Sequence, residues 1–373
     1  MSEPRACSDC LRRAWLVGAL SPAIERALEG RPASRARELL ALGDADLGAA
    51  VADAESGTIL DRARARDAAT LREAVSGAHL WACCRHDEAY PPALADLGDP
   101  PAVLFGRGDA ALLERLRERD GAATIVGSRR ASAYGRDIAT RLGAELAAAG
   151  PAVVSGMALG IDSCAHRGAL DAGGVTVAVL GSGADLASPS RMRQLYDEIC
   201  AVGLVLSELP PGTTARRWTF PARNRIMAAL GAITIVVEAR RGSGSLITAD
   251  LGQHLDREVG AVPGLVGSSP AAGPNDLIHD GAHLIRDGRD VLDVLMGVGT
   301  EDGDRVARRR ADLDPDLAAV LDAVESGAAT QDEIARESGL AAEAVAVALT
   351  RLELDELVAS DAAGRYRPGQ PVT

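Results

Sequence analysis

The chain has 373 residues, of which 47% are hydrophobic and 25% charged, and its formal net charge is −13. These values are typical of a folded protein with two or three domains and exclude a disordered chain. No apolar run reaches the roughly 18 residues of a membrane span, so we expect a cytoplasmic protein with no membrane partner.

The N-terminal part reads as helical. Apolar residues recur at helical spacing through residues 11–75, without a strand pattern, and the runs 11–20 and 23–30 are expected as separate short helices. We therefore predict a helical domain over 1–75. Turn-forming Tyr-Pro-Pro and Asp-Pro-Pro sequences then lead into a short extended run that ends near residue 105.

One cysteine pair lies near the start of this domain and another lies just after its end. CSDC at 7–10 contributes Cys7 and Cys10, and CCRH at 83–86 contributes Cys83 and Cys84. Together they could offer zinc three or four ligands. Because the second group lacks the usual C-x-x-C spacing, reduced and partly buried thiols are the preferred interpretation, and no metal is expected.

From residue 121 the pattern changes to that of an α/β domain. Short β-branched runs alternate with helical segments, which predicts βαβ units and a parallel or mixed sheet over residues 76–298. A charged stretch at 299–313 is expected to be a linker. Residues 314–373 show the order helix, helix, turn, helix, hairpin of a winged helix. The expected strands are ATIVGS, PAVVSG, VTVAVLGSG, GLVLSEL, ITIVVEA and VGAVPG.

Four strand ends of the α/β domain are rich in Gly and small polar residues. In a parallel sheet the carboxyl ends of the strands form the ligand-binding edge, where small residues let the backbone approach a phosphate. An anion-binding crevice is therefore predicted. The glycine spacing does not match the dinucleotide motif, and a chain without Lys has no Walker lysine, so we expect no cofactor. The four stretches are VGSR at 126–129, VSGMALG at 154–160, LGSGAD at 180–185 and EARRGSGS at 238–245.

A basic and aromatic stretch, TARRWTFPARNRI at 214–226, lies in the same domain. Residues 207–249 carry two Glu and six Arg, a net charge of +4, whereas residues 314–373 carry a net charge of −8. Arg binds phosphate in a bidentate manner and aromatic rings stack on unpaired bases. A helix that starts near Arg223 would direct Arg223 and Arg225 at one anion. These residues favour single-stranded nucleic acid over a small phosphorylated ligand.

The sequence gives weaker support to a catalytic site than to nucleic-acid binding. Asp162, Ser163, Cys164 and His166 lie close together in the sequence and suggest a nucleophile. A structural role is preferred, with Asp162 capping a helix and His166 one turn later.

Many ordered motifs give the chain a family resemblance. Between residues 125 and 282 it contains IVGSR, VVSGMALGIDSCAHRGAL, TVAVLGSGAD, LVLSELPPG, FPARNRIMAAL, GSGSLITA and GPNDLIHDGA in that order. Together they resemble the DNA-processing protein A family (DprA, also called Smf). The resemblance implies a Rossmann-like core that binds and protects single-stranded DNA independently of sequence. It also implies loading of a RecA-type recombinase during natural transformation and homologous recombination, without enzyme activity.

The resemblance also implies site residues and partners. The expected partners are single-stranded DNA, a RecA-type recombinase, a single-strand-binding protein and a second copy of the chain. The residues expected to bind nucleic acid are Gly127, Ser128, Arg129, Ser155, Gly156, Arg217, Phe220, Arg223, Asn224, Arg225, Gly242, Ser243, Gly244 and Ser245.

Two other functions remain open from the sequence. Rossmann-like phosphoribohydrolases also place Gly and Arg at a nucleotide phosphate, but this chain has RRGSGSLITAD where they carry a catalytic carboxylate. The third helix of the winged-helix module carries four acidic residues and one Arg, so its approach to a phosphate backbone would be repulsive. We expect that module to contact protein, and a scaffold role for the whole chain is the other alternative.

Overall fold

The computed structural model describes residues 5–32, 35–51, 56–118, 120–297, 314–354, 357–360 and 365–368. The chain divides into two compact units, Met1–Leu295 and Met296–Thr373. The predicted linker, 299–313, lies outside the described residues. Within the described ranges, no helix is both long enough and apolar enough to cross a bilayer.

The larger unit is built on a nine-stranded sheet with the order β1-β2-β6-β5-β4-β3-β7-β8-β9. Pairing is antiparallel between β1, β2 and β6 and parallel from β6 to β9. The chain adds strands on one side of β3 and then returns to its other side, which makes β3 and β7 a topological switch point. The strands are β1 (Trp81–Cys84), β2 (Val103–Gly108), β3 (Ala122–Val126), β4 (Ala152–Ser155), β5 (Thr176–Val179), β6 (Leu204–Ser207), β7 (Ile233–Val236), β8 (Glu258–Ala261) and β9 (His283–Leu284).

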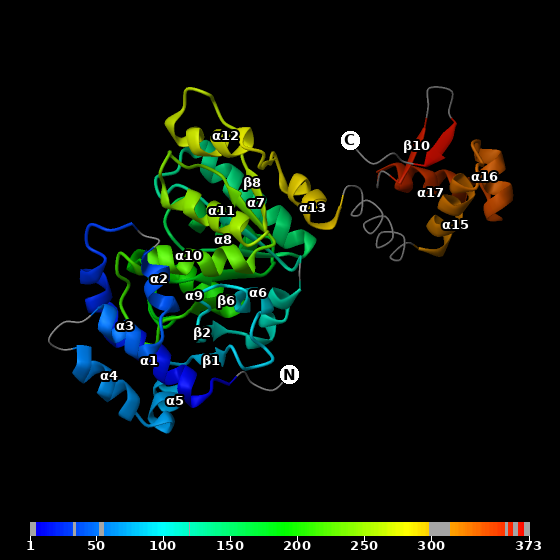
Figure 1. Ribbon diagram of the computed structural model, residues 1–373. Coiled ribbons are helices and arrows are strands. Elements are labelled where there is room, and N and C mark those ends of the chain that lie inside the picture. Colours follow the sequence, from blue (N-terminus) through cyan, green and yellow to red (C-terminus); the bar gives the residue numbers. More distant parts are fainter. Residues whose placement is uncertain are drawn as a thin grey trace. The chain divides into compact units, whose positions relative to one another are not determined.

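Helices cover both faces of this sheet (Figure 1). One face packs on α7 (Ala133–Ala149), α8 (Ile161–Asp171) and α13 (Gly288–Met296) through a core of buried aliphatic side chains. The other packs on α10 (Thr219–Leu230) and α11 (Gly244–His254). The remaining helices of the sheet domain are α6 (Pro92–Ala95), α9 (Arg193–Val202) and α12 (Ala272–His279). The strands at the centre of the sheet are buried on both sides, as their continuous β-branched runs require.

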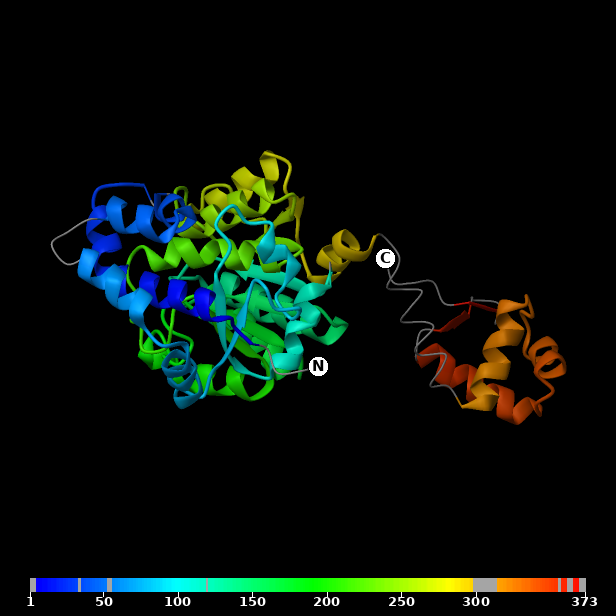
Figure 2. The same ribbon diagram turned by 60° about the horizontal axis from the view of Figure 1, so that its bottom comes forward.

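The N-terminal helices pack beside the sheet, next to α10 (Figures 1 and 2). The segments 11–20 and 23–30 are predicted as separate helices, but residues 11–27 lie in one helix, α1, which continues through Pro22 and ends at Ala27. The loss of one backbone hydrogen bond at Pro22 is offset by the apolar face of α1, where Leu16, Leu20 and Ile24 are fully buried. These helices are α1 (Ser8–Ala27), α2 (Arg35–Ala41), α3 (Asp44–Ala50), α4 (Ser56–Ala65) and α5 (Ala68–Gly77).

The smaller unit consists of α15 (Pro315–Glu325), α16 (Gln331–Ser338), α17 (Ala342–Leu354) and the hairpin β10 (Val358–Ser360) and β11 (Tyr366–Pro368). Thr330 and Glu333 form a capping box at the start of α16, and Gly339 ends that helix with φ 72°. The predicted fold class, a Rossmann-like mixed sheet with N-terminal helices and a C-terminal winged helix, is confirmed. The exact boundary between residues 1–75 and 76–298 stays a prediction, because both segments belong to one compact unit.

Candidate functional site

A cavity of about 530 Å³ lies at the carboxyl ends of β3, β4 and β7, at the switch point of the sheet. Ligands of open α/β sheets bind at this position. Of the fourteen predicted site residues, ten line the cavity, and that their side chains bind nucleic acid stays a prediction. The ten are Gly127, Ser128, Arg129, Arg217, Phe220, Arg223, Asn224, Ser243, Gly244 and Ser245.

The loop after β3 is held in place by its neighbours. The Ser128 amide donates to the Glu238 carbonyl at 2.7 Å, and the Ile161 amide donates to the Ser128 carbonyl at 3.2 Å. A Cβ atom at Gly127 would lie 2.9 Å from the Cβ of Ile161, so the tight turn requires glycine. The buried Glu238 carboxylate accepts from the amide and hydroxyl of Ser132. The backbone that carries Arg129 is thereby fixed.

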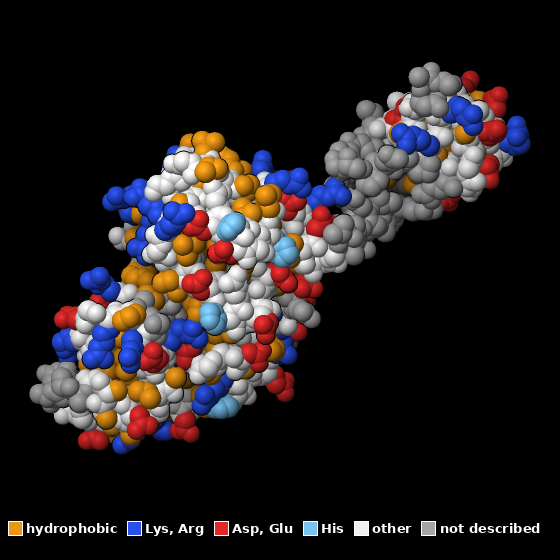
Figure 3. Space-filling model, turned by 45° about the horizontal axis from the view of Figure 1, so that its top comes forward, with side chains coloured by type: hydrophobic (Ala, Val, Ile, Leu, Met, Phe, Trp, Pro, Cys, Tyr) orange, Lys and Arg blue, Asp and Glu red, His pale blue; other side chains and the backbone are white. Residues whose placement is uncertain are grey.

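Three guanidinium groups at the cavity are exposed and have no ion-pair partner within the described part of the chain: those of Arg129, Arg217 and Arg240. The Arg129 guanidinium lies 5.1 Å from the centre of the Phe220 ring, at cation–π distance. The sequence prediction omitted Arg240, although its Arg-Arg-Gly-Ser-Gly-Ser context was among the strand-end signals. On the face seen in Figure 3, Arg side chains gather in groups on the larger unit despite the negative total charge.

The N-terminus of α11 also borders the cavity. Ser243 precedes the helix, and its hydroxyl does not cap it. The Ser243 and Thr248 hydroxyl oxygens are buried and have no hydrogen-bond partner among the described residues. Free amides at a helix start attract an anion, and unsatisfied hydroxyls are suited to hydrogen-bond it. The groups at this edge of the cavity are therefore suited to a negatively charged ligand, and binding of such a ligand stays a prediction.

Arg223 lines the cavity from a buried position, with 5% of the residue exposed. Its guanidinium donates to the carbonyls of Gly156 and Val179 and lies 4.0 Å from the Asp162 carboxylate. Burial lowers the pKa of Arg223 to about 10, although Asp162 opposes this effect. The expectation that a helix starts near Arg223 is wrong, since α10 begins at Thr219. Arg223 joins the ends of β4 and β5 and supplies charge only at the base of the cavity.

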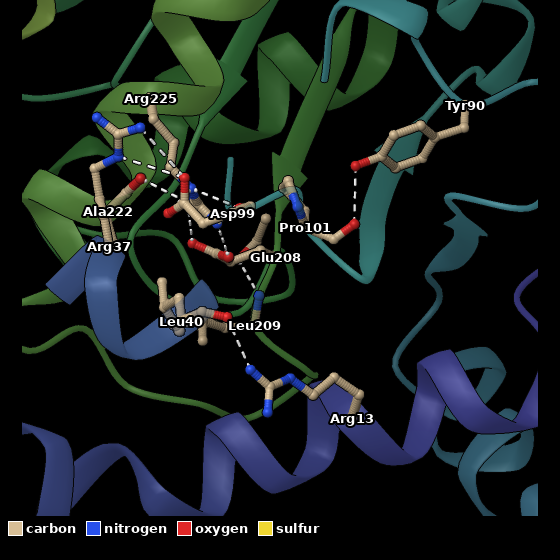
Figure 4. A network of polar contacts seen from close by, with 11 residues as sticks. Arg13, Arg37, Leu40, Tyr90, Asp99, Pro101, Glu208, Leu209, Ala222 and Arg225 are labelled. Atoms are coloured by element: carbon tan, nitrogen blue, oxygen red, sulfur yellow. Dashed lines mark hydrogen bonds and ion pairs between the residues drawn. The ribbon is translucent and has the colours of Figure 1, made fainter. Parts of the chain in front are cut away.

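Arg225 is the principal correction to the predicted site. It lies on a different face of α10 and is buried, and its guanidinium makes a bidentate pair with Glu208 at 2.7 Å and a 2.8 Å contact with Asp99 (Figure 4). Arg37 lies 3.4 Å from the other Asp99 oxygen. Burial alone would lower the pKa of Arg225, but Glu208 and Asp99 raise it above its ordinary value. This side chain is structural because its charge is already neutralised.

Three other predicted residues support the cavity without lining it. The Ser155 hydroxyl is buried and donates to the Ile125 carbonyl at 2.6 Å, which joins β4 to β3. A side chain at Gly156 would collide with the Arg223 guanidinium. Gly242 has φ 75° and forms the turn before α11.

Trp218 had no predicted role, and the structure gives it one in packing. It is 4% exposed, and its ring nitrogen donates to the Ser21 carbonyl at 3.2 Å. The Glu25 carboxylate accepts from the amides of Arg217 and Trp218. The side chain is part of the core formed by α1 to α4. Helix α1 thus holds the segment that presents Arg217.

The Asp162–His166 segment does not form a nucleophile site. The Asp162 carboxylate accepts from the Gly156 and Ala158 amides, so it holds the preceding loop rather than capping its own helix. His166 is fully buried and lies 2.6 Å from the Thr176 hydroxyl. Burial lowers its pKa to about 3, and it is therefore neutral. Neither group is directed at the Cys164 thiol in the described contacts.

Two family models match the chain. Residues 81–296 match the model described as DNA recombination-mediator protein A, and residues 306–364 match the DprA winged helix domain. The first match covers the sheet and the cavity, and the second covers the helices and the first hairpin strand of the C-terminal unit.

Similar proteins carry the same family names. The protein named DprA in Mycobacterium tuberculosis is 42% identical over 274 residues, which are 72% of this chain and 69% of that protein. The X-ray structure of DNA processing protein A from Streptococcus pneumoniae has a TM-score of 0.60 and 31% identity, covering 76% of this chain and 95% of that one. A Helicobacter pylori DNA processing protein A structure, whose description concerns its single-stranded DNA binding mode, has a TM-score of 0.50 and 31% identity over 55% of this chain and 92% of that one.

Proposed function

The chain belongs to the DNA recombination-mediator protein A (DprA/Smf) family of DNA processing proteins, and on this premise we propose that its switch-point cavity binds single-stranded DNA without regard to sequence. The same binding would protect the strand and present it to a RecA-type recombinase in natural transformation and homologous recombination.

The observation that carries the proposal is the group of unpaired guanidiniums at the cavity. Arg129, Arg217 and Arg240 are exposed, while within the lining the one carboxylate, Asp162, is buried against Arg223. A phosphate backbone would neutralise this surplus of positive charge and release its own counterions. The α11 start adds amide donors on one side of the cavity.

Sequence independence follows from the types of group present. Phosphate contacts fix the position of a strand but carry no sequence information. The Phe220 ring is half-buried and is the aromatic surface of the cavity on which a base would stack, and every base has such a π-face. Duplex DNA keeps its bases stacked inside, so it would offer Phe220 no partner.

The test is a fluorescence anisotropy titration of the full chain with single-stranded and duplex oligonucleotides at several salt concentrations. Arg129→Ala and Arg217→Ala are expected to weaken binding equally for all sequences and to reduce the slope of log K against log salt by roughly 1 per lost phosphate contact. Phe220→Ala is expected to cost about 1–3 kcal/mol of binding free energy.

Arg193→Ala is the matched control, because Arg193 is an exposed Arg on α9 that pairs with Asp197 outside the cavity. Its affinity and salt slope should equal those of the wild type. If Arg129→Ala binds every oligonucleotide as tightly as the wild type at all salt concentrations, the site assignment is wrong.

The proposed activity is binding and loading rather than catalysis. The one carboxylate in the cavity lining supports this, since Asp162 is buried and its carboxylate is bound to the Gly156 and Ala158 amides. Incubation with AMP distinguishes the phosphoribohydrolase alternative, because release of free adenine would overturn the proposal. Self-association and recombinase contact are part of the same proposal, and sedimentation of the chain with and without a RecA-type protein tests them.

A further inference from the structure

Four metal-binding side chains from two distant segments meet at the edge of the larger unit. Cys7 and Cys10 lie at the start of α1, and Cys84 and His86 lie at the end of β1. Their ligand atoms all lie within 4.8 Å of one another. The two segments are more than seventy residues apart, so only the fold brings them together.

The distances fit a tetrahedral metal centre. The Nδ1 atom of His86 lies 3.5 Å from the Cys7 sulfur, 3.5 Å from the Cys10 sulfur and 4.0 Å from the Cys84 sulfur. With Zn–S bonds of about 2.3 Å and Zn–N bonds of about 2.0–2.1 Å, tetrahedral ligand atoms lie roughly 3.5–3.8 Å apart. The three nitrogen–sulfur distances lie at or within about 0.5 Å of these values, and all four ligand atoms lie within 4.8 Å of one another, close enough to share one metal ion.

Burial and charge also favour a cation at this point. Cys10 and Cys84 are 4% and 1% exposed. Several thiolates cannot share a buried pocket without a counter-charge, and a dication would supply that charge. The Cys7 amide points at the Cys84 sulfur at 3.4 Å, and the positive end of α1 lies beside Cys7 and Cys10.

We propose that Cys7, Cys10, Cys84 and His86 bind one zinc ion in a closed, structural site. Three sulfurs and one imidazole nitrogen form a Cys₃His set, which selects zinc over hard cations and leaves no position open for substrate. This differs from the ligand set considered from the sequence. Cys83 cannot take part, because successive residues of a strand face opposite ways and Cys83 lies in the core on the other face of β1.

The metal would fasten α1 to the sheet. Its ligands join the first turn of α1 to the end of β1, and the last turns of the same helix hold the Arg217 and Trp218 backbone through Glu25. Helix α1 has 20 residues and is therefore about 30 Å long. The ion would fix its N-terminal end to β1, while its C-terminal end holds the backbone of Arg217 at the cavity.

The experiment uses the full chain, purified under reducing conditions and dialysed against a zinc-buffered solution. Mass-spectrometric metal analysis is expected to find one zinc per chain. Cobalt(II) substitution should give a sulfur-to-metal charge-transfer band and the strong visible absorption of tetrahedral cobalt. Cys10→Ser, Cys84→Ser and His86→Asn should each lose stoichiometric metal and the tetrahedral cobalt spectrum.

Cys83→Ser and Cys200→Ser are the matched controls, since both thiols lie outside the cluster, and they should retain one zinc. His86→Asn keeps the proposal testable if a cysteine variant fails to fold, because His86 is exposed. The proposal is overturned if the dialysed wild type contains no zinc, if a Cys7–Cys10 disulfide is found in its place, or if Cys83→Ser loses as much metal as Cys84→Ser.

Discussion

The guanidinium of Arg225 is surrounded by oxygen atoms. It contacts both Glu208 oxygens, an Asp99 carboxylate oxygen, and the backbone carbonyls of Asp99 and Ala222 (Figure 4). Burial raises the pKa of Asp99, and the Arg225 charge is the main influence that lowers it. The group is therefore an internal counter-ion that joins α10 to the segments before β2 and after β6.

Arg225→Met is expected to destabilise the protein by about 3 kcal/mol or more, because two carboxylates would remain buried without their partner. Urea unfolding followed by circular dichroism measures this loss. Arg193→Met, which removes an exposed i,i+4 pair, should cost under about 0.5 kcal/mol. Single-stranded DNA affinity of the folded Arg225→Met protein should be unchanged. A tenfold loss would mean that Arg225 contacts the strand after all.

His166 gives a prediction for the dependence of stability on pH. The Thr176 hydroxyl donates to the Val153 carbonyl and so accepts from His166 Nδ1, while His166 Nε2 is buried without a partner. Protonation at Nε2 would bury an unpaired charge, and burial lowers the folded-state pKa of His166 to about 3. The unfolded state, with a His pKa of about 6.5, binds the proton first.

Lowering the pH from 7 to 5 is therefore expected to remove about 2 kcal/mol of stability through this residue. The contribution is complete above the unfolded-state pKa and is lost as the pH falls toward the folded-state value. The free energy of unfolding in urea is measured at both pH values for the wild type and for His166→Gln. The contribution of His166 is the difference between the two proteins in the change from pH 7 to pH 5. If that change is the same in both proteins, the prediction is wrong.

At the scale of elements, α1 connects the proposed zinc site to the cavity. Glu25, near its C-terminal end, accepts from the Arg217 and Trp218 amides, which precede the first turn of α10. A carboxylate beside a helix start satisfies amides that the helix leaves open and interacts favourably with the helix dipole. Helix α1 therefore fixes the direction in which Arg217 points.

Glu25→Ala is expected to cost on the order of 1 kcal/mol of stability, as for the loss of a helix cap. It should also weaken single-stranded DNA binding, because the backbone of Arg217 would no longer be held at the cavity. Thermal unfolding and anisotropy titration measure the two effects. Glu29→Ala removes an exposed carboxylate just after α1 and should change neither. Unchanged DNA affinity in Glu25→Ala would show that Arg217 needs no such support.

At the scale of the molecule, most of the net negative charge belongs to the C-terminal unit. The C-terminal residues 314–373 carry a net charge of −8 of the total −13. Such a module repels a phosphate backbone, and salt screens that repulsion over about 10 Å at 0.1 M. The large unit should thus bind single-stranded DNA without help from the small one.

A chain ending at residue 297 is expected to bind single-stranded DNA at least as tightly as the full chain, with the difference shrinking as salt is raised. Anisotropy titrations of both chains at matched salt measure this. If the truncated chain binds DNA more weakly than the full chain, the winged helix contacts DNA. If the truncated chain loses only its binding to the recombinase, the winged helix has the expected role in protein contact.

The α/β sheet and the position of the cavity could be predicted from the sequence, because both depend on which residues follow one another along the chain. Alternating β-branched and helical runs specify a doubly covered parallel sheet, since each strand must be buried on both faces. Strand-end glycines in VGSR and GSGS locate the cavity, because parallel strands present these ends at one edge. The family resemblance rests on the same ordered motifs.

Only the tertiary structure decided what each basic or sulfur-containing side chain does. Arg217, Arg223 and Arg225 share one short stretch, but one is exposed, one lies at the base of the cavity and one is sealed against Glu208 and Asp99. Likewise Cys84 faces Cys7 while Cys83 does not. The reason is physical: the free energy of a charge or a thiol depends on the groups around it in space, and residues far apart in the sequence supply those groups.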